Sequence, residues 1–244
     1  MHLRRYRSKV HTLDAQVRHK GTPVSEPGPA PKRSRPAVST RDKLIAVSLA
    51  LFNERGPDRV TTAQIAEAAG VNEGNLYYYF KTKQALILAI FDQFEAAVER
   101  LLDGSRAANA DPAAYVAFLR EWFEIVWTYR FLYRDFMSLL ATAPELRRRI
   151  RAISERIRTP IKDLIGHMRM AGLMDLSDEE LDVLLPNLWI VSTYWVVYLD
   201  VQEGVGTLQK SHLEWGLKQV ASLFRPYLTK AARDWLGTQP DALL

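Results

Sequence analysis

The chain has 244 residues, of which 48% are hydrophobic and 25% are charged, so it is long and apolar enough to bury a core. It contains no cysteine, which excludes a disulfide framework, thiolate metal sites and a cysteine nucleophile. The net charge is +5, but residues 1–38 hold nine Lys and Arg against two acidic residues, whereas the remaining residues hold 24 against 26. The excess positive charge therefore belongs to an N-terminal arm, and the rest of the chain is nearly neutral.

The arm, residues 1–38, ends in a stretch rich in Pro, Gly and Ser at residues 20–38, which is typical of a disordered linker. Its charge predicts contact with a polyanion, most simply nucleic acid. The alternative is a solvated leader without a binding role. The arm has no apolar segment like that of a signal peptide. Together with the lack of cysteine, this favours a cytoplasmic protein.

Beyond the arm every signal is helical, and no segment alternates as a strand does. Capping residues such as Ser39, Thr61 and Asn72 predict helix starts in the first half of the chain. In the second half, Asp111 precedes a proline at the first helical position, and Ser177 opens a capping box with Glu180. The sequence predicts an all-α fold of about nine helices, at residues 39–56, 61–70, 72–80, 82–101, 111–130, 131–141, 144–172, 177–201 and 207–236.

The segment Val183–Leu199 carries no charge and raises the question of a membrane span. It is shorter than the ~20 residues that a span requires. It also contains Pro186 and Asn187, and its flanking residues are acidic instead of basic. We expect a helix that is buried on both faces within a soluble assembly.

Residues 61–83 have the layout of a helix-turn-helix, in which a glycine at position 70 supplies the turn between two short helices. In the second helix, Leu76 and Phe80 are four residues apart and face the core. At ~100° per residue, Tyr78 then points away from the core, with Tyr77 and Tyr79 on its flanks. This surface offers amide, backbone and phenol groups that hydrogen-bond to phosphates and base edges. The alternative is an amphipathic hairpin that binds protein.

The stretch 61–83, TTAQIAEAAGVNEGNLYYYFKTK, resembles the DNA-binding signature of tetracycline-repressor-type (TetR-like) bacterial regulators. The pattern T-x-x-x-I-A-x-x-A-G-V-x-x-G-x-L-Y-x-x-F-x-x-K is met at every fixed position, by Thr61, Ile65, Ala66, Ala69, Gly70, Val71, Gly74, Leu76, Tyr77, Phe80 and Lys83. The close resemblance covers about residues 39–90, and the C-terminal half matches only in helical layout and length. It implies a three-helix DNA-binding domain at residues 39–84. It also implies a helical domain at residues 85–240 that dimerises and holds a small-molecule pocket.

The resemblance also implies roles for individual residues. Thr62 and Lys83 would hold phosphates, and a further set would lie at or in the major groove: Asn72, Glu73, Gly74, Asn75, Tyr77, Tyr78 and Tyr79. Two positions depart from the common pattern, because Glu73 stands where Lys is frequent and Tyr79 where His is frequent. An acid suits a helix N-terminus but repels phosphates. Glu73 therefore either points away from DNA or accepts a hydrogen bond from a cytosine amine.

The second half is rich in aromatic residues, which predict a pocket for a small apolar or planar aromatic effector. The residues expected to line it are Trp122, Trp127, Phe131, Tyr133, Phe136, Trp189 and Tyr194. The alternative is that most of them are simple core. Arg130, Arg134 and Asp135 could anchor a polar group of the effector or form a surface ion pair.

The helix at residues 178–201 is apolar on all sides and must be covered on both faces. With the last helix it could pair with a second subunit about a two-fold axis, as a four-helix interface. The residues expected at this interface are Leu188, Trp195, Val197, Leu213, Leu217, Val220 and Phe224.

No sequence feature points to catalysis, to a cofactor or to a metal. The motifs HExxH, G-x-S-x-G and the phosphate-binding loop are missing from the sequence, and the two histidines beyond the arm, His167 and His212, are isolated. The sequence predicts a homodimeric transcriptional regulator, most simply a repressor, that binds a palindromic operator in double-stranded DNA and is released by an effector. The alternatives are a helical scaffold protein and a DNA-binding regulator without an effector.

Overall fold

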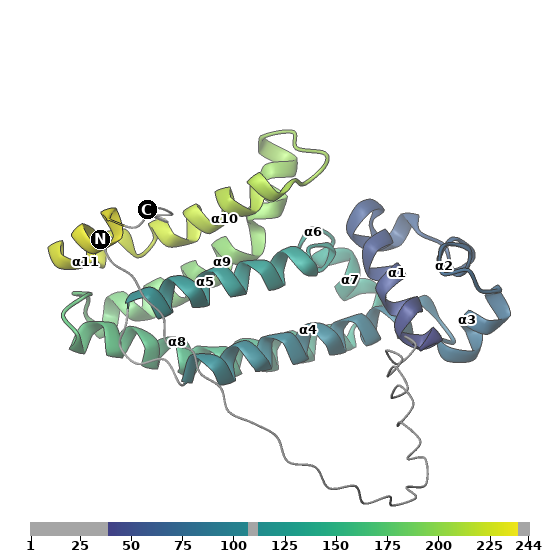
Figure 1. Cartoon of the computed structure of the whole chain (residues 1–244), viewed down its shortest axis with the longest axis horizontal. Helices are drawn as coiled ribbons and strands as arrows, with labels where there is room; N and C mark the ends of the chain where they lie inside the picture. The colour runs from purple at the N-terminus through teal and green to yellow at the C-terminus, as the bar shows by residue number, and fades with distance from the viewer. Residues whose placement is uncertain (1–38, 107–111, 239–244) are drawn as a thin grey trace, which may run out of the picture. The chain divides into compact units, whose positions relative to one another are not determined.

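The computed structural model describes residues 39–106 and 112–238, and these residues form eleven α-helices, two short 3-10 helices and no strand (Figure 1). The all-α prediction is confirmed. The polyanion and disorder predictions for residues 1–38, and the cap predicted at Asp111, lie outside the described residues.

The N-terminal helices are α1 (Thr40–Arg55), η1 (Pro57–Arg59), α2 (Thr62–Ala68), α3 (Glu73–Tyr79) and α4 (Lys83–Arg106). The C-terminal helices are α5 (Pro112–Thr128), α6 (Phe131–Arg134), α7 (Phe136–Thr142), α8 (Glu145–Met170), α9 (Asp178–Gln202), α10 (Lys210–Ser222), η2 (Arg225–Tyr227) and α11 (Lys230–Gly237). The described helices belong to one compact unit, and the domain boundary predicted after residue 84 falls in the first turn of α4.

Local capping chemistry sets the helix starts, as predicted. The side chains of Ser39, Thr61, Asn72 and Ser177 each accept a hydrogen bond from the backbone N–H three residues later. The backbone N–H groups of Thr61 and Ser177 in turn donate to the side chains of Gln64 and Glu180, which completes a capping box at each start. These bonds satisfy backbone N–H groups that have no partner inside the helix.

The prediction of about nine helices was wrong in two places. The helix expected at 131–141 is two helices, because Asp135 between α6 and α7 has non-helical backbone angles (φ −102°, ψ 22°). The helix expected at 207–236 ends at Ser222, and η2 and α11 follow. Pro226 accounts for this break, since it has no N–H to continue the hydrogen-bond ladder.

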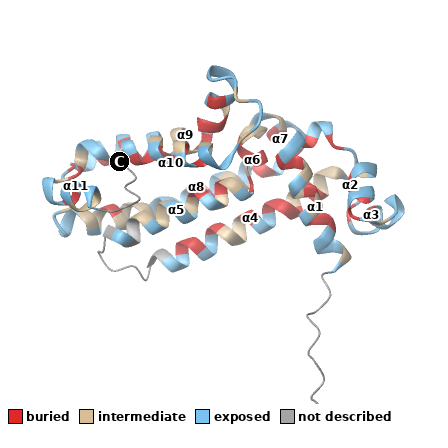
Figure 2. Cartoon of the chain, turned by 45° about the horizontal axis from the view of Figure 1, so that its top comes forward, coloured by how far each residue is buried: buried red, intermediate tan, exposed pale blue. Residues whose placement is uncertain are grey.

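One core runs from α1 to α11 through all the described helices. In the N-terminal part Leu44, Phe52, Ile65 and Leu76 are fully buried and hold α1, α2 and α3 together. Further on, α4 packs against α1, α5 and α8, and α9 packs against α6 and α10. Figure 2 shows buried residues alternating with exposed ones along α4, whose inner face belongs to this core.

A polar junction fastens α1 to the start of α6. The amide of Asn53, which is 8% exposed, donates to Thr128 O at 2.8 Å and accepts from Phe131 N at 3.0 Å. Arg134 donates to Phe52 O at 2.8 Å and to Asn53 O at 3.0 Å. A cation at the C-terminus of α1 also suits the helix dipole. The junction fixes α1 against the C-terminal helices.

The same contacts correct the interpretation of Arg134 and Asp135. Arg134 forms an ion pair with Asp135 at 2.8 Å, as one of the two alternatives expected. The guanidinium of Arg134 also bonds to the end of α1, so it is not available to anchor an effector. Arg130 instead covers the ring of Trp127, 4.5 Å from its centroid.

Helix α9 is the one described helix long and apolar enough to cross a membrane, judged by length and composition alone. One face of it, with Leu181, Leu185, Leu188 and Trp195, is buried against the rest of the chain. The expectation of burial on both faces therefore holds for only one face within a single subunit.

Candidate nucleic-acid interface and effector cavity

Helix α3 presents the surface that periodicity predicts. Leu76 and Phe80 are buried, whereas Tyr78 is 74% exposed and Tyr77 and Tyr79 are 40% and 38% exposed. The rings of Tyr78 and Tyr79 meet edge to face, 5.1 Å apart. Aromatic side chains are seldom left this exposed without a partner, so the surface is suited to binding. The predicted orientation of α3 is confirmed, and its contact with DNA stays a prediction.

Gly74 lies on the same outer surface, in the first turn of α3. A Cβ added at this position would meet only the side-chain oxygen of Asn72, at 3.4 Å. Packing within the subunit therefore gives no reason for a glycine here. The missing side chain leaves room for close approach of an external surface, as the DNA-binding prediction requires. Asn72 itself uses that oxygen to cap α3, by accepting from Asn75 N at 2.7 Å.

Glu73 belongs to a hydrogen-bonded network that joins the starts of α2 and α3. Thr62 Oγ1 donates to Glu73 Oε1 at 2.8 Å and lies 3.0 Å from the Tyr77 hydroxyl. Because Thr62 gives its one proton to the carboxylate, the Tyr77 hydroxyl must be the donor in the second bond. The carboxylate is thus turned toward α2, which favours the first of the two interpretations of Glu73. Spacing alone did not reveal this network, because its members lie on two helices.

Lys83 is held inside the subunit. Its ammonium donates to Pro57 O at 2.7 Å and to Val60 O at 3.2 Å, and so ties the start of α4 to η1. Two of its three protons are used in this way. The predicted phosphate contact of Lys83 depends on the third proton, and Thr62 is likewise already bonded to Glu73.

A cavity of about 390 Å³ lies among the C-terminal helices and α4, and its volume is within the range of small-molecule sites. Four of the predicted residues line it: Trp122, Tyr133, Phe136 and Trp189. The polar side chains in the lining are few, namely Tyr133, Ser154, Arg158, Ser192 and Thr193. Burial raises the pKa of the Tyr133 phenol, which therefore stays protonated and able to donate.

The other three predicted pocket residues lie elsewhere. Phe131 is fully buried and packs on Phe52, with ring centroids 5.5 Å apart. Trp127 lies under Arg130. Tyr194 is on the exposed face of α9, where its ring lies at a steep angle to the rings of Phe136 and Trp189, with centroids 6.4 Å and 6.2 Å away. The pocket assignment does not extend to these side chains.

Helix α8 contributes a row of lining residues that the sequence interpretation missed. They are Leu146, Ile150, Ile153, Ile157, Ile161, Ile165 and Met168. Their spacing of three to four residues is the signal of a helix with one apolar face. The arginines between them made this helix look like a basic surface element.

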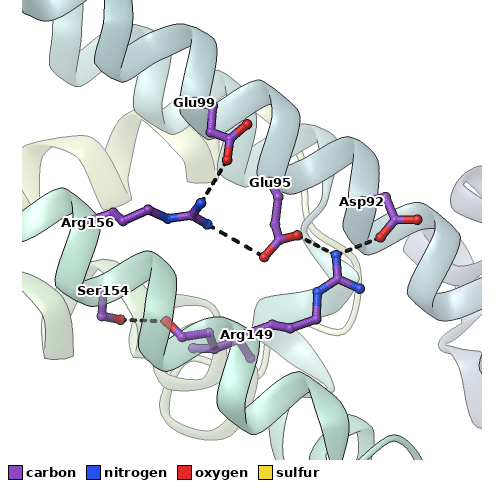
Figure 3. A network of polar contacts seen from close by, with 7 residues as sticks. Asp92, Glu95, Glu99, Arg149, Ser154 and Arg156 are labelled. Atoms are coloured by element: carbon purple, nitrogen blue, oxygen red, sulfur yellow. Dashed lines mark hydrogen bonds and ion pairs between the residues drawn. The ribbon is translucent and has the colours of Figure 1, made fainter.

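Ion pairs join α8 to α4 beside this cavity. Figure 3 shows Arg149 and Arg156 of α8 pointing toward three carboxylates of α4. Arg149 bonds to Glu95 and, at 2.6 Å, to Asp92, and Arg156 bonds to Glu99 at 2.8 Å. Burial alone would lower the pKa of the Arg149 guanidinium, but the hydrogen bonds and charges of Glu95 and Asp92 raise it above its usual value.

Most residues predicted for the dimer interface are buried in one subunit. Trp195 is 3% exposed, and Leu188, Leu213, Leu217 and Val220 are also buried. Three of the predicted seven, Leu188, Val220 and Phe224, line the cavity. Packing within the subunit thus accounts for these side chains. The surface left for the predicted dimer contact is the outer face of α9. Of the seven residues predicted for the dimer interface, Val197 lies on this outer face and is half-buried.

That outer face carries an apolar seam, defined here as Val183, Ile190, Tyr194, Val197 and Val201. With Asn187 between the first two, the positions follow spacings of four and three residues along the whole helix. This is the repeat of a helix that pairs with another helix. Val183, Ile190, Tyr194 and Val201 are exposed.

The comparisons with known proteins agree with these features. A family model described as "Bacterial regulatory proteins, tetR family" matches residues 44–90, and one described as "Bacterial transcriptional repressor" matches residues 93–236. Among solved structures, a TetR-family transcriptional regulator from Marinobacter aquaeolei VT8 is 32% identical, with a TM-score of 0.70. The match covers 81% of this chain and 95% of that one. A TetR regulator from Haloarcula marismortui shares the fold at 19% identity and a TM-score of 0.57, covering 78% of this chain and 98% of that one.

The curated relatives match over a shorter stretch. The "HTH-type transcriptional repressor NicS" of Pseudomonas putida is 28% identical over 110 residues, which is 45% of this chain and 50% of the relative. The "HTH-type transcriptional regulator RutR" of Escherichia coli K12 is 34% identical over 116 residues, which is 47% of this chain and 55% of the relative. The chain thus spans about half the length of the curated relatives that it matches.

Proposed function

Because the chain belongs to the TetR family of bacterial regulatory proteins, we propose that it is a DNA-binding transcriptional regulator. It acts most simply as a repressor, binds a palindromic operator as a homodimer and is released by a small-molecule effector. The observation that carries this proposal is the exposed face of α3, where three consecutive tyrosines, a glycine and two asparagines lie outside the core. A cytoplasmic location follows from this role.

The proposed docking places α3 in the major groove. Tyr78, the most exposed of the three tyrosines, would contact base edges or phosphates, while the backbone at Gly74 allows a close approach. Two such helices read one palindrome when they lie about one DNA turn apart, ~34–36 Å. The dimer must therefore fix their spacing.

The outer seam of α9 supports the homodimer. An exposed apolar row on a helix in water calls for a covering surface, and in a two-fold dimer the same row from the partner supplies it. Its 4–3 spacing suits antiparallel or parallel pairing of two α9 helices. Each subunit would keep its buried face of α9 for its own core.

The cavity supports release by an effector. Phe91 and Phe94 line it, and both belong to α4, which begins next to the reading helix α3. A ligand that binds better to a conformer with a different α3 spacing lowers operator affinity through linkage.

Titration of labelled DNA from upstream of the protein's own gene, followed by fluorescence anisotropy, tests the proposal. We expect saturable binding, and we expect Tyr78→Ala to lose at least about fivefold in affinity, since a specific base contact contributes ~1–3 kcal/mol. The circular dichroism and the dimer should not change, because Tyr78 makes no core contact. Equal affinity of the variant, or no preference over scrambled DNA, would count against the docking.

Two alternatives remain distinguishable by the same experiments. A scaffold protein would leave both DNA probes unbound and would use α3 to bind protein. An effector-independent regulator would bind operator but show no ligand-dependent release. Among the described residues, no group of three or more His, Asp and Glu could hold a metal ion.

A further inference from the structure

The cavity has a single charged residue in its lining, and this residue is Arg158. All other described lining residues are apolar side chains, hydroxyl groups or one phenol. A lone cation beside an apolar cavity favours a ligand that carries one anionic group and is apolar elsewhere. It therefore bears on the chemical class of the effector.

Arg158 has no acidic partner among the described residues, and of the unpaired arginines of α8 it is the one that lines the cavity. Arg149 and Arg156 are paired with α4, and Lys162 and Arg169 are paired with Asp182 at 3.2 Å and Asp178 at 2.6 Å. Glu155 and Asp163, the acids nearest to Arg158 along the helix, make no ion pair with it. The guanidinium is free to bind an anion that comes from outside the chain.

The cavity is long for its volume. Its lining residues on α8 run from Leu146 to Met168, which at 1.5 Å per residue is ~33 Å of helix. The lining as a whole begins at α4 and α7, the helices near α1, and ends at Trp235 of α11, at the other end of the bundle (Figure 1). A volume of about 390 Å³ spread over this length fits an extended molecule better than a compact one.

The charge of the lining selects among anions. Arg158 can hold a carboxylate with two parallel N–H bonds. A dianionic phosphate would leave one charge uncompensated, because no second cation lines the cavity in the described residues. Ser154, one turn earlier on α8, already gives its proton to Ile150 O at 3.0 Å, so the guanidinium is the anchor.

We propose that the effector is an extended monocarboxylate whose apolar body fills the cavity and whose carboxylate pairs with Arg158. This inference rests on the proposed function of the cavity as an effector site. The apolar body supplies the affinity, since nearly all lining residues are apolar. The carboxylate supplies orientation and discrimination against neutral molecules of the same length.

The test uses linear alkanoates from octanoate to hexadecanoate and the matched primary alkanols, below their micellar concentrations, with the full chain. Tryptophan fluorescence reports binding, because Trp122, Trp189 and Trp235 line the cavity. We expect the affinity to rise about fourfold per methylene until the cavity is full, the equivalent of ~0.8 kcal/mol. We expect each alkanoate to bind roughly five- to tenfold more tightly than its alkanol.

Arg158→Gln should remove this preference for the alkanoate while leaving the chain-length dependence intact. Arg148→Gln is the matched control, since Arg148 is exposed on the same helix and does not line the cavity. The inference is overturned if alkanols bind as well as alkanoates, if Arg158→Gln keeps the preference, or if no member of the series binds.

Operator binding measured in parallel separates the two proposals. Alkanoates that bind with the expected preference but leave operator affinity unchanged would support the ligand class and contradict release by an effector. Tight operator binding without any alkanoate binding would contradict the ligand class and leave the DNA-binding function intact.

Discussion

The replacement Asn53→Leu tests the junction between α1 and α6 most directly, because leucine has a similar volume but no hydrogen-bonding group. It deprives the buried N–H of Phe131 of its acceptor and the carbonyl of Thr128 of a donor. A buried polar group left without a partner costs about 1–3 kcal/mol. The N–H of Phe131 would carry the full cost. Thr128 is exposed, so its carbonyl would instead bond to water and cost little. We expect the free energy of unfolding to fall by about 1–3 kcal/mol.

Chemical denaturation at equal protein concentrations measures this loss, since a dimer's stability depends on concentration. In a thermal melt the same loss corresponds to a midpoint lower by about 2–12 °C. Glu54→Leu is the control, because Glu54 is the exposed neighbour whose pair with Arg55 lies at the surface. It should change stability by less than ~0.5 kcal/mol. A loss at Asn53 below ~1 kcal/mol, or one equal to the control, would refute the junction as a stabilising element.

Three further tests, two of which include a comparison variant, address other parts of the structure. Glu73→Gln should tighten DNA binding about two- to fivefold at low salt, and the gain should vanish at high salt; weaker binding would instead indicate a base contact. Gly216→Ala should destabilise by about 1–2 kcal/mol, because its Cβ would lie 2.7 Å from the ring of Trp195. Gly166→Ala, with nothing within 4 Å, should instead stabilise by ~0.5–1 kcal/mol in the same denaturation assay. Ile190→Glu should yield monomers by light scattering while Met170→Glu, outside the seam, keeps the dimer; unchanged mass in both would contradict the interface.

The helix starts and the orientation of α3 were predictable because their causes are local. A cap needs only the residue that accepts and the N–H three positions later, as at Ser39 and Asn72. The outward direction of Tyr78 follows from the positions of Leu76 and Phe80 and the helical period.

Two of the failures have a different cause, namely contacts between residues far apart in the sequence. The break at Asp135 accompanies the bonds of Arg134 to α1, about eighty residues earlier. On α9, periodicity revealed two apolar faces but could not tell which one is buried. The close contact of Trp195 with Gly216 on α10 decides this, and neither residue identifies the other in the sequence.

The same long-range contacts suggest how the cavity communicates with α3. On α4, Phe91 and Phe94 line the cavity, while Asp92 and Glu95 of the same helix bind Arg149 of α8. Arg149 also lies over the Phe91 ring, 4.7 Å from its centroid. A ligand that shifts either phenylalanine must therefore shift these ion pairs as well.

The start of α4 decides what such a shift does to the reading helix. Lys83 fixes it to η1 through two carbonyl bonds, and α4 packs against α1, whose core holds α2 and α3. If an effector acts as proposed, we expect a movement of α4 to be passed on to α1, α2 and α3 together, because these contacts tie them to its start. The Asn53 junction opposes it by holding the end of α1 against α6. We therefore expect a weakened junction to make operator release easier at a given ligand occupancy, in addition to lowering stability.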